Sequence, residues 1–183
     1  RDGANALLSW TYTILLGEVE GAIRAHGLDA AIGVLHADKL NTPSLALDLV
    51  EPLRPAIADL LVLSILNHAI LRPEHFEVDI DDGGTYLTEE ARKPFFVAYE
   101  QAMTRRFAMA KGSPHTDFRK VIDEQVCIYL RALERGDGVP LEAVEGRVVD
   151  RVEQVVVGQL GVLPRRRAGI PEPVDGAPRR QSG

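Results

Sequence analysis

The chain has 183 residues, of which 45% are hydrophobic and 26% charged, and its formal net charge is −6. This length is sufficient for one domain with a sizeable apolar core. No apolar stretch approaches the ~20 residues that cross a bilayer, so we expect neither a transmembrane nor a signal segment. The single cysteine, Cys127, excludes an intramolecular disulfide and fits a reducing, cytoplasmic setting.

The acidic balance limits how the chain could contact a nucleic acid. Residues 164–183 carry a net charge of +3, which leaves −9 on residues 1–163. Any DNA contact must therefore be local, through a bound cation or a few placed Arg and Lys side chains. Five of the last twenty residues are Arg and seven are Pro or Gly, a composition typical of a disordered tail. We expect one folded unit over 1–163 and a tail over 164–183.

Residues 4–26 carry the clearest helical pattern. Apolar side chains recur at spacings of three and four, and Gly27 supplies a stop. The predicted inward positions are Leu8, Tyr12, Leu15, Val19 and Ile23. His26 falls at the end of this helix, where an imidazole interacts favourably with the C-terminal carbonyl groups.

The stretch from Gly33 to Pro55 organises the rest of the chain. His36 lies in a predicted loop, and Asp48 follows twelve residues later in a helix that Ser44 is expected to cap. An imidazole and a carboxylate together suit Mn²⁺ and also accept Mg²⁺. A satisfied structural pair of His and Asp is the commoner arrangement, so these two residues alone do not decide between the two interpretations.

Two prolines interrupt the helix that contains Asp48. Pro52 and Pro55 have no N–H group, so the carbonyls of Asp48 and Glu51 lose their i+4 donors. Asp48 and Glu51 also fall at i and i+3, on one face of the helix. An interior proline costs ~3 kcal/mol of helix stability. The pattern predicts either a kinked helix with Glu51 paired to Arg54 or a turn that serves a site.

The remaining elements follow in order. Helical spacing resumes over 55–71, residues 76–87 alternate around a Gly-containing turn as a short β-hairpin, and two helices are expected over 88–111 and 115–135. These two helices carry Arg105, Arg106 and Arg119, the predicted phosphate contacts if DNA binds. Cys127 lies in the second of them, where the pattern predicts a buried structural thiol. Residues 141–160 again have helical spacing.

Five ordered segments resemble the CRISPR-associated integrase family, Cas1. They are Asn5-Ala-Leu-Leu-Ser-Trp-Thr-Tyr12, Gly33-Val-Leu-His36, Ser44-Leu-Ala-Leu-Asp48-Leu-Val-Glu51-Pro52-Leu-Arg54-Pro55, Phe95-Phe-Val-Ala-Tyr99-Glu100 and Arg119-Lys-Val-Ile-Asp-Glu-Gln125. The resemblance covers about residues 2–136. It implies a mainly α fold, namely the helical C-terminal lobe of a Cas1 protein with a possible short β-hairpin. The family's N-terminal β domain, through which it dimerises, is expected to be absent from the chain.

The same resemblance implies a site. His36 and Asp48 correspond to two of three ligands for Mg²⁺ or Mn²⁺, and the third is a glutamate on a helix that precedes the Asn5 segment in the family. That glutamate is expected to be missing here. Glu18 lies near the inward stripe of the first helix, but it lacks the surrounding motif. The resemblance assigns supporting roles to Glu51, Arg54, Asn5 and Tyr12.

The implied function is CRISPR adaptation, in which a metal-dependent DNA endonuclease inserts spacer DNA into the CRISPR array by transesterification. The implied partners are spacer and repeat DNA, a Cas2-like bridging protein and, in the full-length family, a second copy; no membrane is involved. An alternative is a catalytically inactive helical interaction module that retains the family scaffold. A His-Asp phosphohydrolase is disfavoured, because His36-Ala-Asp38 does not supply adjacent His and Asp ligands.

Overall fold

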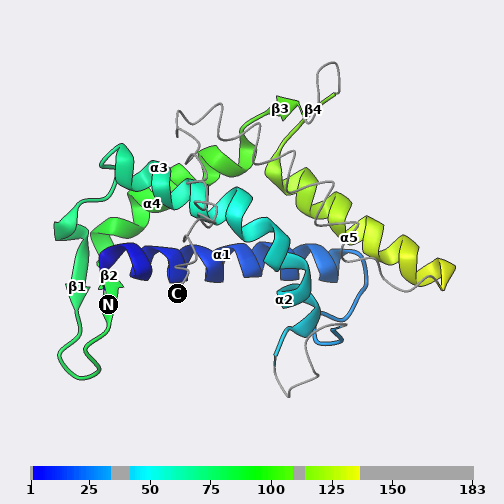
Figure 1. The fold of residues 1–183 in the computed structure, drawn as a ribbon, viewed down its shortest axis with the longest axis horizontal. Coiled ribbons are helices and arrows are strands. Elements are labelled where there is room, and N and C mark those ends of the chain that lie inside the picture. The colour runs from blue at the N-terminus through cyan, green and yellow to red at the C-terminus, as the bar shows by residue number, and fades with distance from the viewer. Residues whose placement is uncertain (1, 34–41, 109–113, 137–183) are drawn as a thin grey trace, which may run out of the picture.

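The computed structural model describes residues 2–33, 42–108 and 114–136 and is mainly helical, as the sequence predicts (Figure 1). The pattern over 141–160, the boundary at residue 163 and the tail all lie outside these residues. The five α-helices of the described part are α1 (Gly3–Ala25), α2 (Ser44–Val50), α3 (Leu60–Asn67), α4 (Glu89–Thr104) and α5 (Phe118–Arg135). No described helix is both long and apolar enough to cross a membrane.

Helix α1 is the central element, with α2, α3 and α5 packed along it (Figure 1). Asp2 caps it by accepting from the Asn5 N–H at 2.9 Å, and Gly27 follows its C-cap with φ of 74°. Its fully buried stripe consists of Leu7, Thr11, Leu15, Val19 and Ile23.

The prediction that Leu8 and Tyr12 point into the core is therefore wrong by one position, since both are only partly buried. The stripe instead includes a polar residue, Thr11. The Thr11 hydroxyl donates to the Leu7 carbonyl at 2.7 Å, which satisfies its hydrogen bond within the helix and allows complete burial.

The two prolines after Asp48 have the predicted effect on the backbone. Helix α2 passes into a 3-10 turn, η1 (Glu51–Leu53), and then into a π-helical stretch, η2 (Arg54–Asp59), before α3 begins. Each proline withholds one N–H from the i+4 ladder, and the chain responds by tightening and then widening its turns. Two helical segments of different pitch, η2 and α3, thus replace the single predicted helix over 55–71, and α3 already ends at Asn67.

Two small antiparallel strand pairs complete the described fold. The predicted hairpin is confirmed as β1 (Phe76–Val78) paired with β2 (Thr85–Leu87), and it follows a short 3-10 turn, η3 (Pro73–His75). The second pair, β3 (Phe107–Ala108) with β4 (His115–Thr116), was not predicted.

This second pair shows that the helix predicted over 88–111 is too long and that the next one starts later than predicted. Helix α4 ends at Thr104, and α5 begins only at Phe118. No breaker precedes Gly112 in the sequence, so local pattern could not place the end. Side-chain packing determines where the helix ends. The Phe107 and Phe118 rings lie with centroids 5.0 Å apart, so Phe107 packs against the start of α5 instead of continuing α4.

Helix α5 closes the core. Asp117 caps it by accepting from the Lys120 N–H, and Gly136 ends it in the left-handed conformation with φ of 67°. Its buried residues are Phe118, Val121, Ile122, Gln125, Val126, Tyr129 and Ala132.

Candidate functional site

Asp48 is the one buried carboxylate among the described residues, with 2% of its surface exposed. It lies on α2, where Leu45 and Leu49 anchor the chain in the core beside it, as Leu53 does in η1. Burial of an ionised carboxylate is costly unless a cation or several donors stabilise it. A buried carboxylate of this kind is a candidate ligand for a divalent cation.

Gly33, three residues before His36, lies against this carboxylate. A Cβ added at Gly33 would be 3.1 Å from Asp48 Oδ2 and 2.6 Å from the Ser44 Cβ, so only a glycine allows this approach. Ser44 precedes Asp48 by one helical turn, and its hydroxyl is buried without a hydrogen-bond partner among the described residues. Residues 33, 44 and 48 thus place a buried carboxylate and an orphaned hydroxyl beside the backbone three residues before His36.

Ser44 is not the cap that the sequence predicts. It is the first residue of α2, the cap position belongs to Pro43, and no side chain caps this helix. A capping role would turn the hydroxyl toward the backbone of its own first turn. The buried, unbonded hydroxyl is instead available to a group outside the helix.

Helix α5 supports α2 from the other side. Gln125 is 1% exposed, and its Nε2 donates to the Leu49 carbonyl at 2.9 Å, across 76 residues of sequence. Gln125 is therefore an amide that packs one helix on another. Tyr129 lies one turn further on; its burial, followed by the negative charge of Asp48, raises the pKa of its hydroxyl. Tyr129 therefore remains neutral beside the carboxylate.

Tyr12 and Arg54 belong to a neighbouring polar cluster. The Tyr12 hydroxyl donates to Asp59 Oδ1 at 2.5 Å, and the Arg54 guanidinium carbon lies 5.4 Å from the Tyr12 ring centroid. Burial and the Asp59 contact raise the pKa of Tyr12 to about 12. These contacts join α1 to η2, the π-helical stretch that the prolines create. The roles of Tyr12 and Arg54 as supporting residues remain a proposal.

The other predicted site residues are placed as follows. Glu51 is exposed, so it does not share the burial of Asp48. Asn5 is exposed in the first turn of α1, whereas α2 lies under the opposite half of that helix in Figure 1. His36 lies outside the described residues.

Arg119 is held between two carboxylates. Its guanidinium contacts Glu18 at 3.0 Å and Glu100 at 2.7 Å. The hydrogen bonds from Glu100 and then Glu18 raise the pKa of Arg119, and the Arg119 contact lowers the pKa of Glu100. Glu18, considered above as a metal ligand, is thus engaged by Arg119. Arg105 and Arg106 are exposed just after α4.

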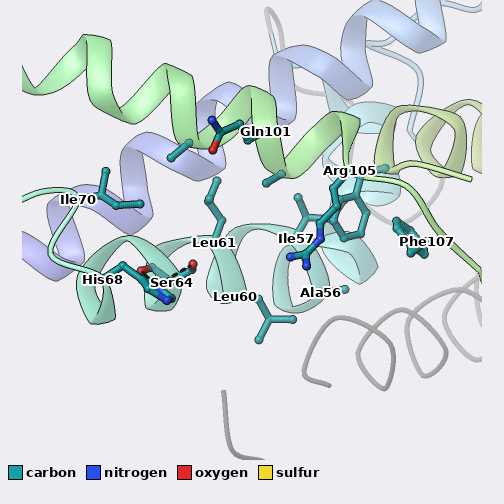
Figure 2. A pocket seen from close by; sticks show the side chains of 13 residues that line it. Ala56, Ile57, Leu60, Leu61, Ser64, His68, Ile70, Gln101, Arg105 and Phe107 are labelled. Carbon is teal, nitrogen blue, oxygen red and sulfur yellow. Dashed lines mark hydrogen bonds between the residues drawn. The ribbon is translucent and has the colours of Figure 1, made fainter. Parts of the chain in front are cut away.

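A hollow in the described part of the chain lies elsewhere, between α3 and α4 (Figure 2). Its volume is about 540 Å³, and its walls are mostly apolar. Figure 2 shows Gln101 of α4 facing Leu61, with His68 and Ser64 joined at one end and Arg105 at the other. No Asp, Glu or Cys is among its described lining residues, so it offers no acidic or thiolate metal ligand.

Sequence reasoning missed Tyr129 as part of the site and gave Gly33 no role beyond its place in the His36 motif. Tyr129 stands one helical turn after the motif residue Gln125. Their relation to Asp48 depends on how α2, α5 and the loop pack, which no local pattern shows.

Comparison with known proteins identifies the relatives of this fold. The sequence model of the family described as "CRISPR associated protein Cas1" matches residues 1–101. The CRISPR-associated endonuclease Cas1 2 of Rhodospirillum rubrum is 46% identical over 100 residues, which are 55% of this chain and 29% of that protein.

Two solved structures show the same arrangement of helices. A Cas1 protein from Thermotoga maritima superimposes with a TM-score of 0.66 at 29% identity, covering 76% of this chain and 43% of that one. A chain of a partial Cas6-RT-Cas1–Cas2 complex has a TM-score of 0.62 at 20% identity over 81% and 42% of the two chains, which shows a shared fold alone.

The fold and the site together define a helical protein that buries a carboxylate on a helix interrupted by prolines. The chain belongs to the Cas1 family of CRISPR-associated proteins. It spans less than half of the length of the relatives described above.

Proposed function

We propose that the chain is the catalytic lobe of a Cas1-type DNA integrase, in which Asp48 and His36 hold a Mg²⁺ or Mn²⁺ ion. The single observation that carries the proposal is the burial of Asp48 with its Oδ2 turned toward Gly33, three residues before His36. Carboxylate, hydroxyl and imidazole donors suit either ion. The orphaned Ser44 hydroxyl fits the same group, since a cation or its hydration water would give it a partner.

A divalent ion bound there would stabilise the negative charge that develops when a hydroxyl attacks a phosphodiester. The chain's own residues orient the ligands. Gln125 fixes the carbonyl of Leu49, the residue after Asp48, and thereby the rotation of α2. Tyr129, kept neutral, adds no second negative charge beside the carboxylate.

The proposed substrates and partners follow the family. Spacer and CRISPR-repeat DNA are the substrates, and transesterification of the repeat strand by a spacer 3′-hydroxyl is the reaction. A Cas2-like protein is the proposed partner, and a structural relative of this chain occurs in a Cas1–Cas2 complex. For the full-length protein, we propose in addition the glutamate that completes the family's ligand set. We also propose that the full-length protein dimerises. We also propose the domain boundary after residue 163.

The decisive test is Mn²⁺ titration by calorimetry on the chain and on Asp48→Asn. We expect the parent to bind and the variant to lose at least about tenfold in affinity, because the ligand set loses its buried anion. Glu51→Gln is the matched control: it removes a carboxylate three residues away that is exposed, and it should bind as the parent does. DNA cleavage with and without metal completes the experiment.

Two outcomes separate the candidates. Mn²⁺ binding that depends on Asp48 and His36, without cleavage, would indicate a real site that lacks its third ligand. A parent chain that binds no Mn²⁺ would contradict the proposed metal centre and leave the helical interaction module, which keeps the scaffold without the chemistry.

DNA binding offers a separate prediction on the exposed arginines. Arg106→Gln should lower the slope of log affinity against log salt concentration by about 0.9, the value for one lost phosphate contact on duplex DNA. Arg119→Gln should leave that slope unchanged, because Glu18 and Glu100 already neutralise the guanidinium, and should instead weaken the packing of α1, α4 and α5. If both variants lower the slope equally, Arg119 contacts a DNA phosphate as Arg106 does, and this prediction is wrong.

A further inference from the structure

A second cluster of potential ligands lies where the end of α1 meets α5. His26 is the C-cap of α1, and Asp123 and Cys127 are one turn apart on α5. His26 Nε2 lies 2.7 Å from Asp123 Oδ1 and 3.8 Å from Cys127 Sγ, and the ligand atoms of all three residues lie within 4.8 Å of one another. The predictions for His26 as a helix-end residue and Cys127 as a buried thiol did not connect them. Cys127 is only half-buried.

The carboxylate and the thiol converge on the same imidazole nitrogen. In a nucleophilic triad the acid binds one ring nitrogen and orients the ring, while the other ring nitrogen takes the proton of the thiol. That arrangement is excluded here, because Nε2 faces both groups. A single ring nitrogen has either one proton to donate or one lone pair to offer. It cannot serve both neighbours well, whereas a cation placed among the three atoms would be bound by each.

The spacing of the three atoms agrees with such a cation. Nitrogen, oxygen and sulfur ligands at about 2.0–2.3 Å from a tetrahedral ion lie roughly 3.3–3.6 Å from one another. The measured separations of 2.7 and 3.8 Å lie on either side of that range. Only small side-chain movements are needed, and they are available because the Asp123 side chain is 60% exposed.

The donor set decides which cation fits. Thiolate and imidazole select borderline and soft transition metals such as Zn²⁺, whereas Mg²⁺ and Mn²⁺ prefer oxygen ligands. Deprotonated Cys127 and Asp123 would also balance the charge of a divalent ion. We propose that His26, Asp123 and Cys127 form a second metal site of the Zn²⁺ class, which fastens the end of α1 to α5. It involves none of the residues around Asp48, so it stands independently of the proposed integrase site.

Cobalt titration is the sharpest test, because Cys127 is the only cysteine in the chain. A thiolate-to-cobalt charge-transfer band can therefore arise from this residue alone. Under reducing conditions, we expect Co²⁺ to produce this band at one equivalent and Zn²⁺ to displace it. Cys127→Ser should abolish the band, and His26→Gln and Asp123→Asn should each weaken Co²⁺ binding at least about tenfold.

Asp48→Asn is the matched control and should keep the full band, which separates this site from the metal centre proposed above. Zn²⁺ should also raise the melting temperature of the parent but not of Cys127→Ser, because an ion that binds only the folded state stabilises it. Absence of the band in the parent, or a band that persists unchanged in His26→Gln, would overturn the proposal. Either result would leave His26 and Asp123 as an ordinary ion pair between the helices.

Discussion

Replacement of Gly33 by alanine is expected to lower the free energy of unfolding by about 1–3 kcal/mol, the usual cost of adding a methyl group where no space exists. The new Cβ would lie 2.6 Å from the Ser44 Cβ and 2.9 Å from the Ser44 carbonyl carbon. Because the second contact is with backbone, α2 or the loop must move. The same displacement moves residue 33 away from Asp48, so under the proposed metal centre Mn²⁺ affinity should also fall by about tenfold or more.

Gly17→Ala is the control for this prediction. Gly17 lies in α1, and an added Cβ there meets nothing within 4 Å. Alanine should therefore stabilise the chain by about 0.5–1 kcal/mol through its better helix propensity. Urea unfolding of both variants measures the contrast, and calorimetry measures the metal. If Gly33→Ala is as stable as the parent and binds Mn²⁺ normally, the close approach of residue 33 to Asp48 is wrong.

Phe95→Ala is expected to have the largest effect on stability, about 3–5 kcal/mol, which is the range for removing a fully buried aromatic ring. Phe95 has no exposed surface. Its ring stacks on Tyr99 at 6.0 Å between centroids and meets the edges of Trp10 and Phe96 at 6.4 and 5.3 Å. The substitution removes these contacts and leaves a cavity between α1 and α4. A loss of this size approaches the total stability of many domains.

The neighbouring Phe96→Ala provides the comparison, since it deletes the same side chain from a position that is 43% exposed. Its cost should be about 1 kcal/mol, mainly from the lost ring contact with Phe95. Denaturant unfolding monitored by circular dichroism gives both values. Similar costs for the two variants would show that Phe95 is not the centre of the aromatic core.

These two predictions concern one architecture. The aromatic cluster holds α4 against α1. Helix α2 packs on α1 and is joined to α5 through the Gln125 amide, so Asp48 lies on a segment that two helices hold. Pro52 and Pro55 then divert the chain through η1 and η2, which brings Arg54 and Asp59 to Tyr12. The two prolines destabilise a regular helix, but the changed backbone path allows contacts that join α1 to the segment after Asp48.

The sequence alone predicts most of the helices of the described chain. The period of apolar residues locates α1 and α5, the missing N–H groups of Pro52 and Pro55 predict the interruption, and Gly27 and Gly136 mark two helix ends. The sequence also predicts the β1–β2 hairpin, and its ordered motifs show the resemblance to Cas1. All of these depend on residues close together in the chain or on ordered motifs.

Tertiary structure decides the rest. Helix α4 ends at Thr104 because Phe107 packs on Phe118, and Thr11 rather than Tyr12 is buried because the neighbours of α1 select its inner face. The approach of Gly33 to Asp48 and the convergence of Asp123 and Cys127 on His26 join residues that lie 15 to 101 positions apart. Such contacts depend on the angles and offsets at which helices pack, which the local pattern of side chains does not encode.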